Sequence, residues 1–227
     1  MLGGLSALPY VPIDRLHALA RGAELPARVV GAALLADISG FTPLADALAA
    51  ALGAQRGAEE LTRHLNEVYG ALIAEVDRYH GAVLGFSGDA VTCWFDGTEE
   101  EAALRATTAA VAMQDAMTAF TELRVPGEEG QRLAVKVAVA SGPARRLRVG
   151  DAAVQYLDAL AGATLDRLAE AEHRAERGQV VLDERAAAAL AGAVVLREGT
   201  RVVERLARRA APASWPPVVD ADVSAES

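Results

Sequence analysis

The stretch ADISGFT (residues 36–42) follows directly on the apolar run VVGAALLA (residues 29–36). A short, unbroken apolar run of this kind predicts a strand that is covered on both faces. The strand ends on the carboxylate of Asp37, and a Ser-Gly-Phe-Thr sequence comes next. An aspartate at the end of a buried strand either caps a turn or holds a ligand, and the rest of the chain has to decide between these roles.

The composition limits the class of protein. A chain of 227 residues corresponds to one domain of ordinary size, and its net charge of −9 argues against general nucleic-acid binding. The single cysteine, Cys93, excludes an intrachain disulfide, and no apolar stretch approaches the length of a membrane span. We therefore expect a cytoplasmic protein that binds neither nucleic acid nor membrane, although metal ions could still mediate nucleotide binding.

Hydrophobic periodicity and turn residues predict the order of elements. Long helices separated by hairpins indicate an α+β, ferredoxin-like fold, with an antiparallel-rich sheet and helices packed on it. The expected domains are an N-terminal helical segment (1–28), a main domain (29–209) and a linker or disordered tail (210–227). The predicted elements of the main domain are a strand at 29–37, two helices between 42 and 78, a hairpin at 82–95, a helix at 98–123, strands at 133–140 and 145–149 with a turn at 141–143, a helix at 160–177, a strand and helix within 179–190, and a hairpin within 193–206.

A second carboxylate, Asp89, lies at the predicted tip of the hairpin 82–95. If the two strands are neighbours, the negative charges of Asp37 and Asp89 repel each other. Neither motif contains a lysine or arginine that would compensate this repulsion. A divalent cation such as Mg²⁺ or Mn²⁺ relieves this repulsion, and such ions commonly use one or two carboxylates together with substrate phosphates. Taken singly, each aspartate is explained as well by a cap or a hairpin turn, but the pair favours a metal site.

The residues after Asp37 suit a phosphate. Ser39, Gly40, Phe41 and Thr42 lie where a helix is expected to start, with Thr42 as the predicted N-cap before Pro43. Backbone N–H groups at a helix start point toward anions, and a glycine lets the backbone approach them closely.

These motifs carry a resemblance. The segments ALLADISGFTPL (33–44) and GFSGDAVTCWF (85–95) resemble the catalytic domain of class III adenylyl and guanylyl cyclases, most closely the first cyclase half of soluble-adenylyl-cyclase-like proteins. The similarity runs from about Pro12 to Arg208 and includes LAVKVAVASGPARRLRVGD (133–151). It makes the main domain a cyclase homology domain.

The resemblance implies a mechanism. Two halves, either a second cyclase half-domain or a homodimer partner, pair head to tail with the site at their interface. Asp37, Asp89 and the backbone carbonyl of Ile38 then hold two Mg²⁺ or Mn²⁺ ions, and ATP is converted to cyclic AMP and pyrophosphate. The choice of ATP over GTP rests on the resemblance alone.

The chain departs from the family pattern at three positions. Gly85 stands where a purine-reading lysine is usual, Asp166 where an asparagine orients the ribose, and Glu170 where an arginine stabilises the transition state. Arg167 and Arg174 lie nearby but not at the expected spacing. The chain therefore resembles the metal-binding half of a site, and we expect it to be inactive or weak alone. Gly85 and Ala169 also argue against bicarbonate regulation through the usual basic contacts.

Other residues have simpler interpretations. Cys93, Trp94 and Phe95 are expected in the core, and Lys136 and Asp46 at the surface. The arginines at 145, 146 and 148 indicate a solvated strand edge or, alternatively, a partner contact. The four histidines, at positions 17, 64, 80 and 173, are expected at the surface or the edge of the core.

Two further functions remain open. The first is a degenerate cyclase-like module that serves regulation or dimerisation, and the second is a palm-like nucleotidyltransferase or diguanylate cyclase. The second lacks support in the hairpin, which has the sequence FSGDA (86–90) in place of Gly-Gly-acidic-acidic-Phe. The intact pair of Asp37 and Asp89 favours the catalytic half over the degenerate module.

Overall fold

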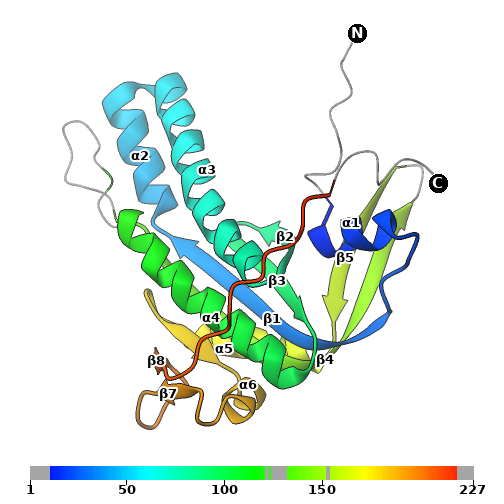
Figure 1. Ribbon diagram of the computed structural model, residues 1–227. Coiled ribbons are helices and arrows are strands. Elements are labelled where there is room, and N and C mark those ends of the chain that lie inside the picture. Colours follow the sequence, from blue (N-terminus) through cyan, green and yellow to red (C-terminus); the bar gives the residue numbers. More distant parts are fainter. Residues whose placement is uncertain (1–10, 121–122, 124–131, 152–153, 219–227) are drawn as a thin grey trace.

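Strand β1 (Arg28–Ser39) is central to the main sheet. The structure is a computed structural model that describes residues 11–120, 123, 132–151 and 154–218. In it β1 pairs antiparallel with β3 (Ala90–Asp96) on one side and with β4 (Ala134–Asp151) on the other. Strands β2 (Ala82–Ser87) and β5 (Gln155–Ala161) lie outside these, and β6 (Val180–Leu182) runs parallel to β4. The predicted α+β fold with an antiparallel-rich sheet is confirmed (Figure 1).

Helices cover both faces of the sheet because β1 is apolar on both sides. Leu34 and Ile38 of β1 belong to the core under α2 (Phe41–Leu52), α3 (Ala54–Arg78) and α4 (Glu99–Met117). Ala33 points the opposite way and packs in a second core with Leu168 of α5 (Ala163–Arg174). The remaining elements are α1 (Ile13–Ala20), a 3₁₀ turn (Thr118–Phe120), α6 (Glu184–Ala189), β7 (Val194–Leu196) and β8 (Val203–Leu206).

The segment after residue 133 differs most from the prediction. β4 runs unbroken through the expected turn at 141–143, because these residues pair with Val30–Ala32 of β1 and long-range pairing overrides local turn preference. β5 was not predicted, and it takes residues 160 and 161 from the predicted helix 160–177, which is α5 and ends at Arg174. The hairpin 82–95 and the elements after residue 179 agree with the prediction.

Residues 210–218, here called the C-terminal strap, pack against the domain where the sequence predicted a linker or disorder. The strap crosses α4 and continues toward α1 (Figure 1). Ala210 N–H donates to Thr108 Oγ1 (3.1 Å), and Ala213 N–H donates to the Arg78 carbonyl (2.8 Å). The predicted tail residues 219–227 lie outside the described residues.

Trp215 anchors the strap. Its ring stacks on His80 and on His17, with centroid separations of 3.6 Å and 5.0 Å, and Nε1 donates to the Gly81 carbonyl (2.8 Å). Both imidazoles also bind the strap backbone, since His80 Nδ1 donates to the Ala213 carbonyl (3.2 Å) and His17 Nε2 to the Pro216 carbonyl (3.0 Å). The two histidines are therefore tied to the strap at the edge of the core.

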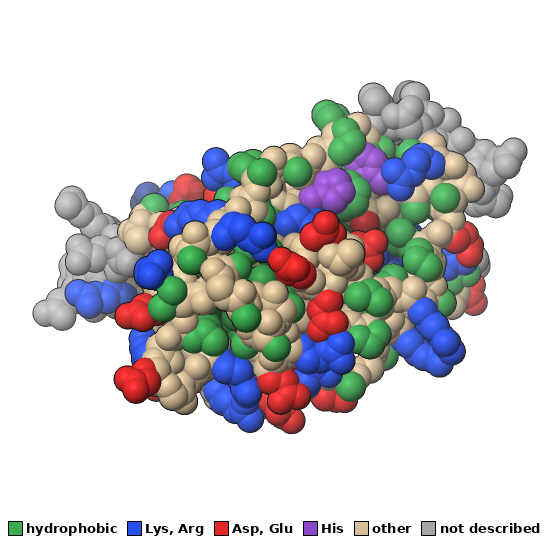
Figure 2. Space-filling model, turned by 60° about the horizontal axis from the view of Figure 1, so that its bottom comes forward, with side chains coloured by type: hydrophobic (Ala, Val, Ile, Leu, Met, Phe, Trp, Pro, Cys, Tyr) green, Lys and Arg blue, Asp and Glu red, His purple; other side chains and the backbone are tan. Residues whose placement is uncertain are grey.

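Acidic and basic side chains intermingle on the face shown in Figure 2. Among the described residues, ion pairs join different elements, for example Arg185 with Glu99 (2.7 Å) and Arg208 with Glu100 (2.7 Å). Among the described residues, none of the helices combines the length and apolarity that crossing a bilayer demands.

Replacing Trp215 tests the strap. Trp215→Ala should lower the free energy of unfolding by about 1.5–4 kcal/mol, because it removes two ring contacts, each worth about 0.5–1.5 kcal/mol, and one hydrogen bond of similar size. Urea unfolding followed by circular dichroism measures this. Arg209→Ala, an exposed change just before the strap, is the control. Equal stability of the two variants would show that the strap is not anchored through Trp215.

The strap should also weaken in acid. Burial lowers the pKa of His80, and the nearby Arg105 lowers it further. The folded state thus favours the neutral form of His80. The stabilisation that neutral His80 provides is fully present above the ordinary histidine pKa of about 6.5, and it declines as the pH falls below that value. His80→Asn, which tolerates the positive φ of this residue, should flatten that decline between pH 7.5 and 5.5. An unchanged profile in urea unfolding would contradict the assignment.

Candidate functional site

The sheet brings Asp37, Ile38 and Asp89 to the same end. Asp37 lies opposite Ala90, the first residue of β3, and Asp89 is in the turn just before it. The Ile38 N–H donates to the Asp89 carbonyl, 3.2 Å away. The two predicted carboxylates, well separated in sequence, are therefore on adjoining backbone segments.

Tyr69 of α3 lies close enough to both carboxylates for their charges to affect the pKa of its hydroxyl. Burial raises the pKa of its hydroxyl, and the negative charges of Asp89 and Asp37 raise it further. Its ring packs on Phe41 (centroids 6.1 Å apart) and forms a T-shaped pair with Phe86 (5.3 Å). An apolar, aromatic wall thus borders the negatively charged end of the sheet.

Lys136 is the main residue that sequence reasoning missed. It was expected to point to solvent, but it lies directly opposite Asp37 in the β1–β4 pairing, and its side chain is only 26% exposed. Its Nζ is 3.2 Å from Asp37 Oδ2 and 2.5 Å from Glu172 Oε1 of α5. Glu172 and then Asp37 raise the pKa of the Lys136 ammonium, so it remains charged at neutral pH. Only the strand register reveals this contact.

Gly40 shapes the start of α2. It has φ +109° and is the N-cap, so the helix begins at Phe41 and the predicted cap, Thr42, is an exposed residue of the first turn. A Cβ on residue 40 would lie 2.4 Å from the Arg132 carbonyl, which makes glycine necessary here. The first N–H groups of α2 have no acceptor within the helix. The Ser39 hydroxyl is already used, since it donates to the Ala134 carbonyl (3.3 Å).

The three positions that depart from the cyclase pattern lie on β2 and α5. Gly85 is half-buried at an irregularity of the β2–β3 pairing, and a Cβ there would meet no atom within 4 Å. Asp166 and Glu170 are exposed on α5, and Glu170 pairs with Arg174 at 3.6 Å. None of the three supplies a cation to the site.

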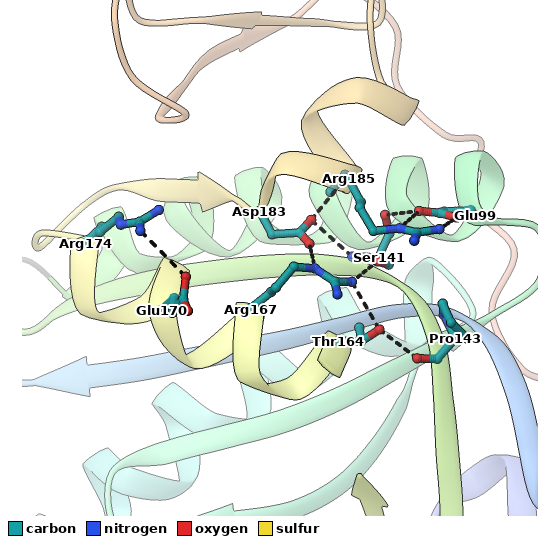
Figure 3. Close-up of polar contacts among 10 residues, drawn as sticks. Glu99, Ser141, Pro143, Thr164, Arg167, Glu170, Arg174, Asp183 and Arg185 are labelled. Carbon is teal, nitrogen blue, oxygen red and sulfur yellow. Dashed lines mark hydrogen bonds and ion pairs between the residues drawn. The ribbon is translucent and has the colours of Figure 1, made fainter. Parts of the chain in front are cut away.

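Arg167 is held within the protein (Figure 3). Its Nε is 2.6 Å from Asp183 Oδ2, and its terminal nitrogen donates to the Ser141 carbonyl (2.8 Å) and to Thr164 Oγ1 (3.2 Å). Asp183 in turn accepts from the Ala186 N–H (2.7 Å) and caps α6. The guanidinium therefore fastens α5 to β4 and α6.

The donor atoms suit a hard cation that the substrate helps to bind. No group of three or more His, Cys, Asp and Glu side chains placed to hold a metal occurs in the described part of the chain. Two carboxylates and a carbonyl, from Asp37, Asp89 and Ile38, match Mg²⁺, which usually takes one or two carboxylates and completes its shell with waters and phosphates. The residues present therefore fit the implied metal.

Comparisons with known proteins agree with this fold. No family model matches the chain. It is 28% identical over 152 residues to adenylate cyclase type 10 of Mus musculus, and equally to that of Homo sapiens. Each alignment covers 67% of this chain. The alignment spans 9% of the length of these relatives.

Solved structures give the same result. The adenylyl cyclase CyaB from P. aeruginosa matches with a TM-score of 0.61 and 19% identity, over 82% of this chain and 91% of that one. The guanylyl cyclase Cya2 matches with a TM-score of 0.59 and 21% identity, over 78% and 90%. The chain thus has the fold of a class III adenylyl or guanylyl cyclase catalytic domain, and the predicted resemblance is confirmed.

Removing the Lys136 charge should destabilise the domain. Lys136→Met leaves Asp37 and Glu172 without their shared cation, and we expect the free energy of unfolding to fall by about 1 kcal/mol at pH 7, since the partners are partly exposed. Because the folded state raises the lysine pKa, this difference should persist at neutral pH and vanish as pH rises above the ordinary value of 10.5. Urea unfolding measures it.

The control is a second change. Adding Glu172→Gln to Lys136→Met removes one of the two facing carboxylates, and it should recover part of the loss. If Glu172→Gln instead worsens the Lys136→Met variant, the two carboxylates do not depend on the ammonium.

Proposed function

We propose that this chain is the metal-binding half of an adenylyl cyclase, and that it converts ATP to cyclic AMP and pyrophosphate only with a complementary half-domain. The observation that carries the proposal is that Asp37 and Ile38 lie next to Asp89 and close to the start of α2, in a domain with a cyclase fold. The similarity to adenylate cyclase type 10 favours ATP as the substrate.

In this proposal the chain positions charge. Asp37, Asp89 and the Ile38 carbonyl would hold the metal ions, which supply Lewis acidity for attack of the ribose 3′ hydroxyl on the α-phosphorus and for departure of pyrophosphate. The backbone N–H groups at the start of α2 would donate hydrogen bonds to phosphate oxygens. Lys136 pairs with Asp37 Oδ2 at 3.2 Å, and in this proposal Asp37 Oδ1 would bind the metal.

The partner must supply the remaining groups. Gly85 has no side chain to read a purine, and Glu170 would repel a triphosphate. Arg167 cannot replace the missing arginine without giving up Asp183 and Ser141. A partner that provides a lysine, an asparagine and an arginine would complete the site.

A regulatory or dimerisation module is the second candidate. It is favoured by the exposed apolar side chains on the β4–β5 hairpin, of which Leu147, Val149 and Leu157 are 40%, 54% and 60% exposed. These positions lie together, since Val149 pairs with Leu157 across the two strands. Such a surface suits a partner domain whether or not catalysis is retained.

The test uses the chain with and without a purified second cyclase half that carries the lysine, asparagine and arginine. Cyclic AMP formation from ATP with Mn²⁺ should require both halves. Asp37→Asn and Asp89→Asn should each reduce the activity of the pair at least about 100-fold. In this proposal, the main contribution of this half is to bind the metal ions that stabilise negative charge on the phosphates. Asp46→Asn, an exposed change of the same kind on α2, is the control.

The outcomes separate the two candidates. Ordinary turnover by the chain alone would contradict the half-site, and full activity of the Asp37 and Asp89 variants would contradict the metal assignment. A pair that forms but stays inactive, with no Mn²⁺ bound in calorimetry, would favour the regulatory module.

A further inference from the structure

A cavity of about 620 Å³ lies between α1, α3, β2 and the C-terminal strap, and it takes no part in the function proposed above. Apolar side chains form most of its wall, including Leu16 of α1, Ile73 of α3, Val83 of β2 and Val218 of the strap. Its volume is in the range of about 300–1,000 Å³ that is usual for sites of small ligands. Segments from four parts of the chain thus border a partly open space of ligand size.

One lining residue carries charge. Asp77 of α3 is half-buried, and among the described lining residues no lysine, arginine or histidine accompanies it. The structure gives the Asp77 carboxylate no hydrogen bond or ion pair with any described residue. Its neighbour His80 feels the Asp77 charge, which raises the His80 pKa, but burial and Arg105 outweigh this and lower that pKa toward the neutral form. His80 also stacks on Trp215 and donates to the Ala213 carbonyl, so it gives Asp77 no hydrogen bond. A partly buried carboxylate that has no hydrogen-bond or ion-pair partner is stabilised by a charged donor.

The β2 side of the cavity leaves room for a ligand. Gly85 lines it, and a Cβ at this position would meet no atom within 4 Å. Phe86, which is 56% exposed, also lines it and offers an aromatic surface to a cation. The position that departs from the cyclase pattern is therefore open space beside the only aromatic ring among the described lining residues.

We propose that this cavity binds a small apolar molecule that carries a protonated amine. The apolar body packs between Leu16, Ile73 and Val83, and the ammonium group pairs with Asp77. The charge of Asp77 and the lack of a basic lining residue select against an anion of the same shape.

Three probes of one shape test the charge preference: 4-phenylbutylamine, 4-phenylbutanol and 4-phenylbutyrate, titrated into the full chain in a calorimeter at pH 7. The amine should bind about tenfold more tightly than the alcohol, and the acid most weakly, because a charge-assisted hydrogen bond is stronger than a neutral one. Asp77→Asn should remove the advantage of the amine, whereas Asp46→Asn, which changes the net charge equally at a remote exposed site, should keep it.

A second variant tests the location without touching the charge. Gly85→Leu fills the cavity from a position that has space for a side chain, and it should abolish binding of all three probes. Equal affinity of the three probes, no binding of any of them, or unchanged binding to Gly85→Leu would each overturn the proposal. If Asp77→Asn fails to fold, the ranking on the unchanged chain and the Gly85→Leu result still decide. Mn²⁺ binding at Asp37 and Asp89 is a separate measurement that none of these results alters.

Discussion

The register of β1 against its two neighbours determines where each charge of the candidate site lies. In this register Asp37 faces Ala90 on one side and Lys136 on the other, while Leu34 and Ile38 point into the larger core. A shift of one residue would turn Asp37 into the core under α2, α3 and α4 and move Leu34 and Ile38 to the face under α5. Gly31 helps to hold the register, because a Cβ there would lie 2.2 Å from the Phe95 carbonyl and 2.7 Å from the Trp94 ring. The site is therefore a consequence of how closely β1 and β3 approach.

Two sets of charges fix α5 against the same sheet. Toward the C-terminal end of the helix, Glu172 meets Lys136, and nearer its start Arg167 meets Asp183, which is 3% exposed. Breaking such a buried pair by removing one partner is costly, because the remaining charge loses its compensation. Asp166 and Glu170 are thus exposed on a helix whose opposite side is fixed by ion pairs to Lys136 of β4 and to Asp183. In the proposed function, it is this held helix that lacks the catalytic side chains.

The sequence was sufficient where the signal is local. The Ser-Gly-Asp turn was predicted where β2 ends and β3 begins, and the apolar run before Asp37 predicted β1, which continues two residues further to Ser39. Long-range contacts escaped it. Lys136 alternates with apolar residues as a solvent-facing residue would, yet its strand is covered by α5. The strap has the composition of a linker. Its order depends on the stacking of Trp215 on His17 and His80, which are far from it in sequence.

Lys136 also explains how two carboxylates can share one end of a sheet before any metal arrives. Both negative charges act on the half-buried Tyr69, whose pKa is raised by burial and further by these charges. The ammonium offsets the negative charge of Asp37, and it is itself held by Glu172 on α5. Asp89, exposed in its turn, is screened by water. In the proposed function, the domain would fold before metal binds and would keep both carboxylates available for it. A half-site requires this order if substrate and partner are to bring the remaining groups.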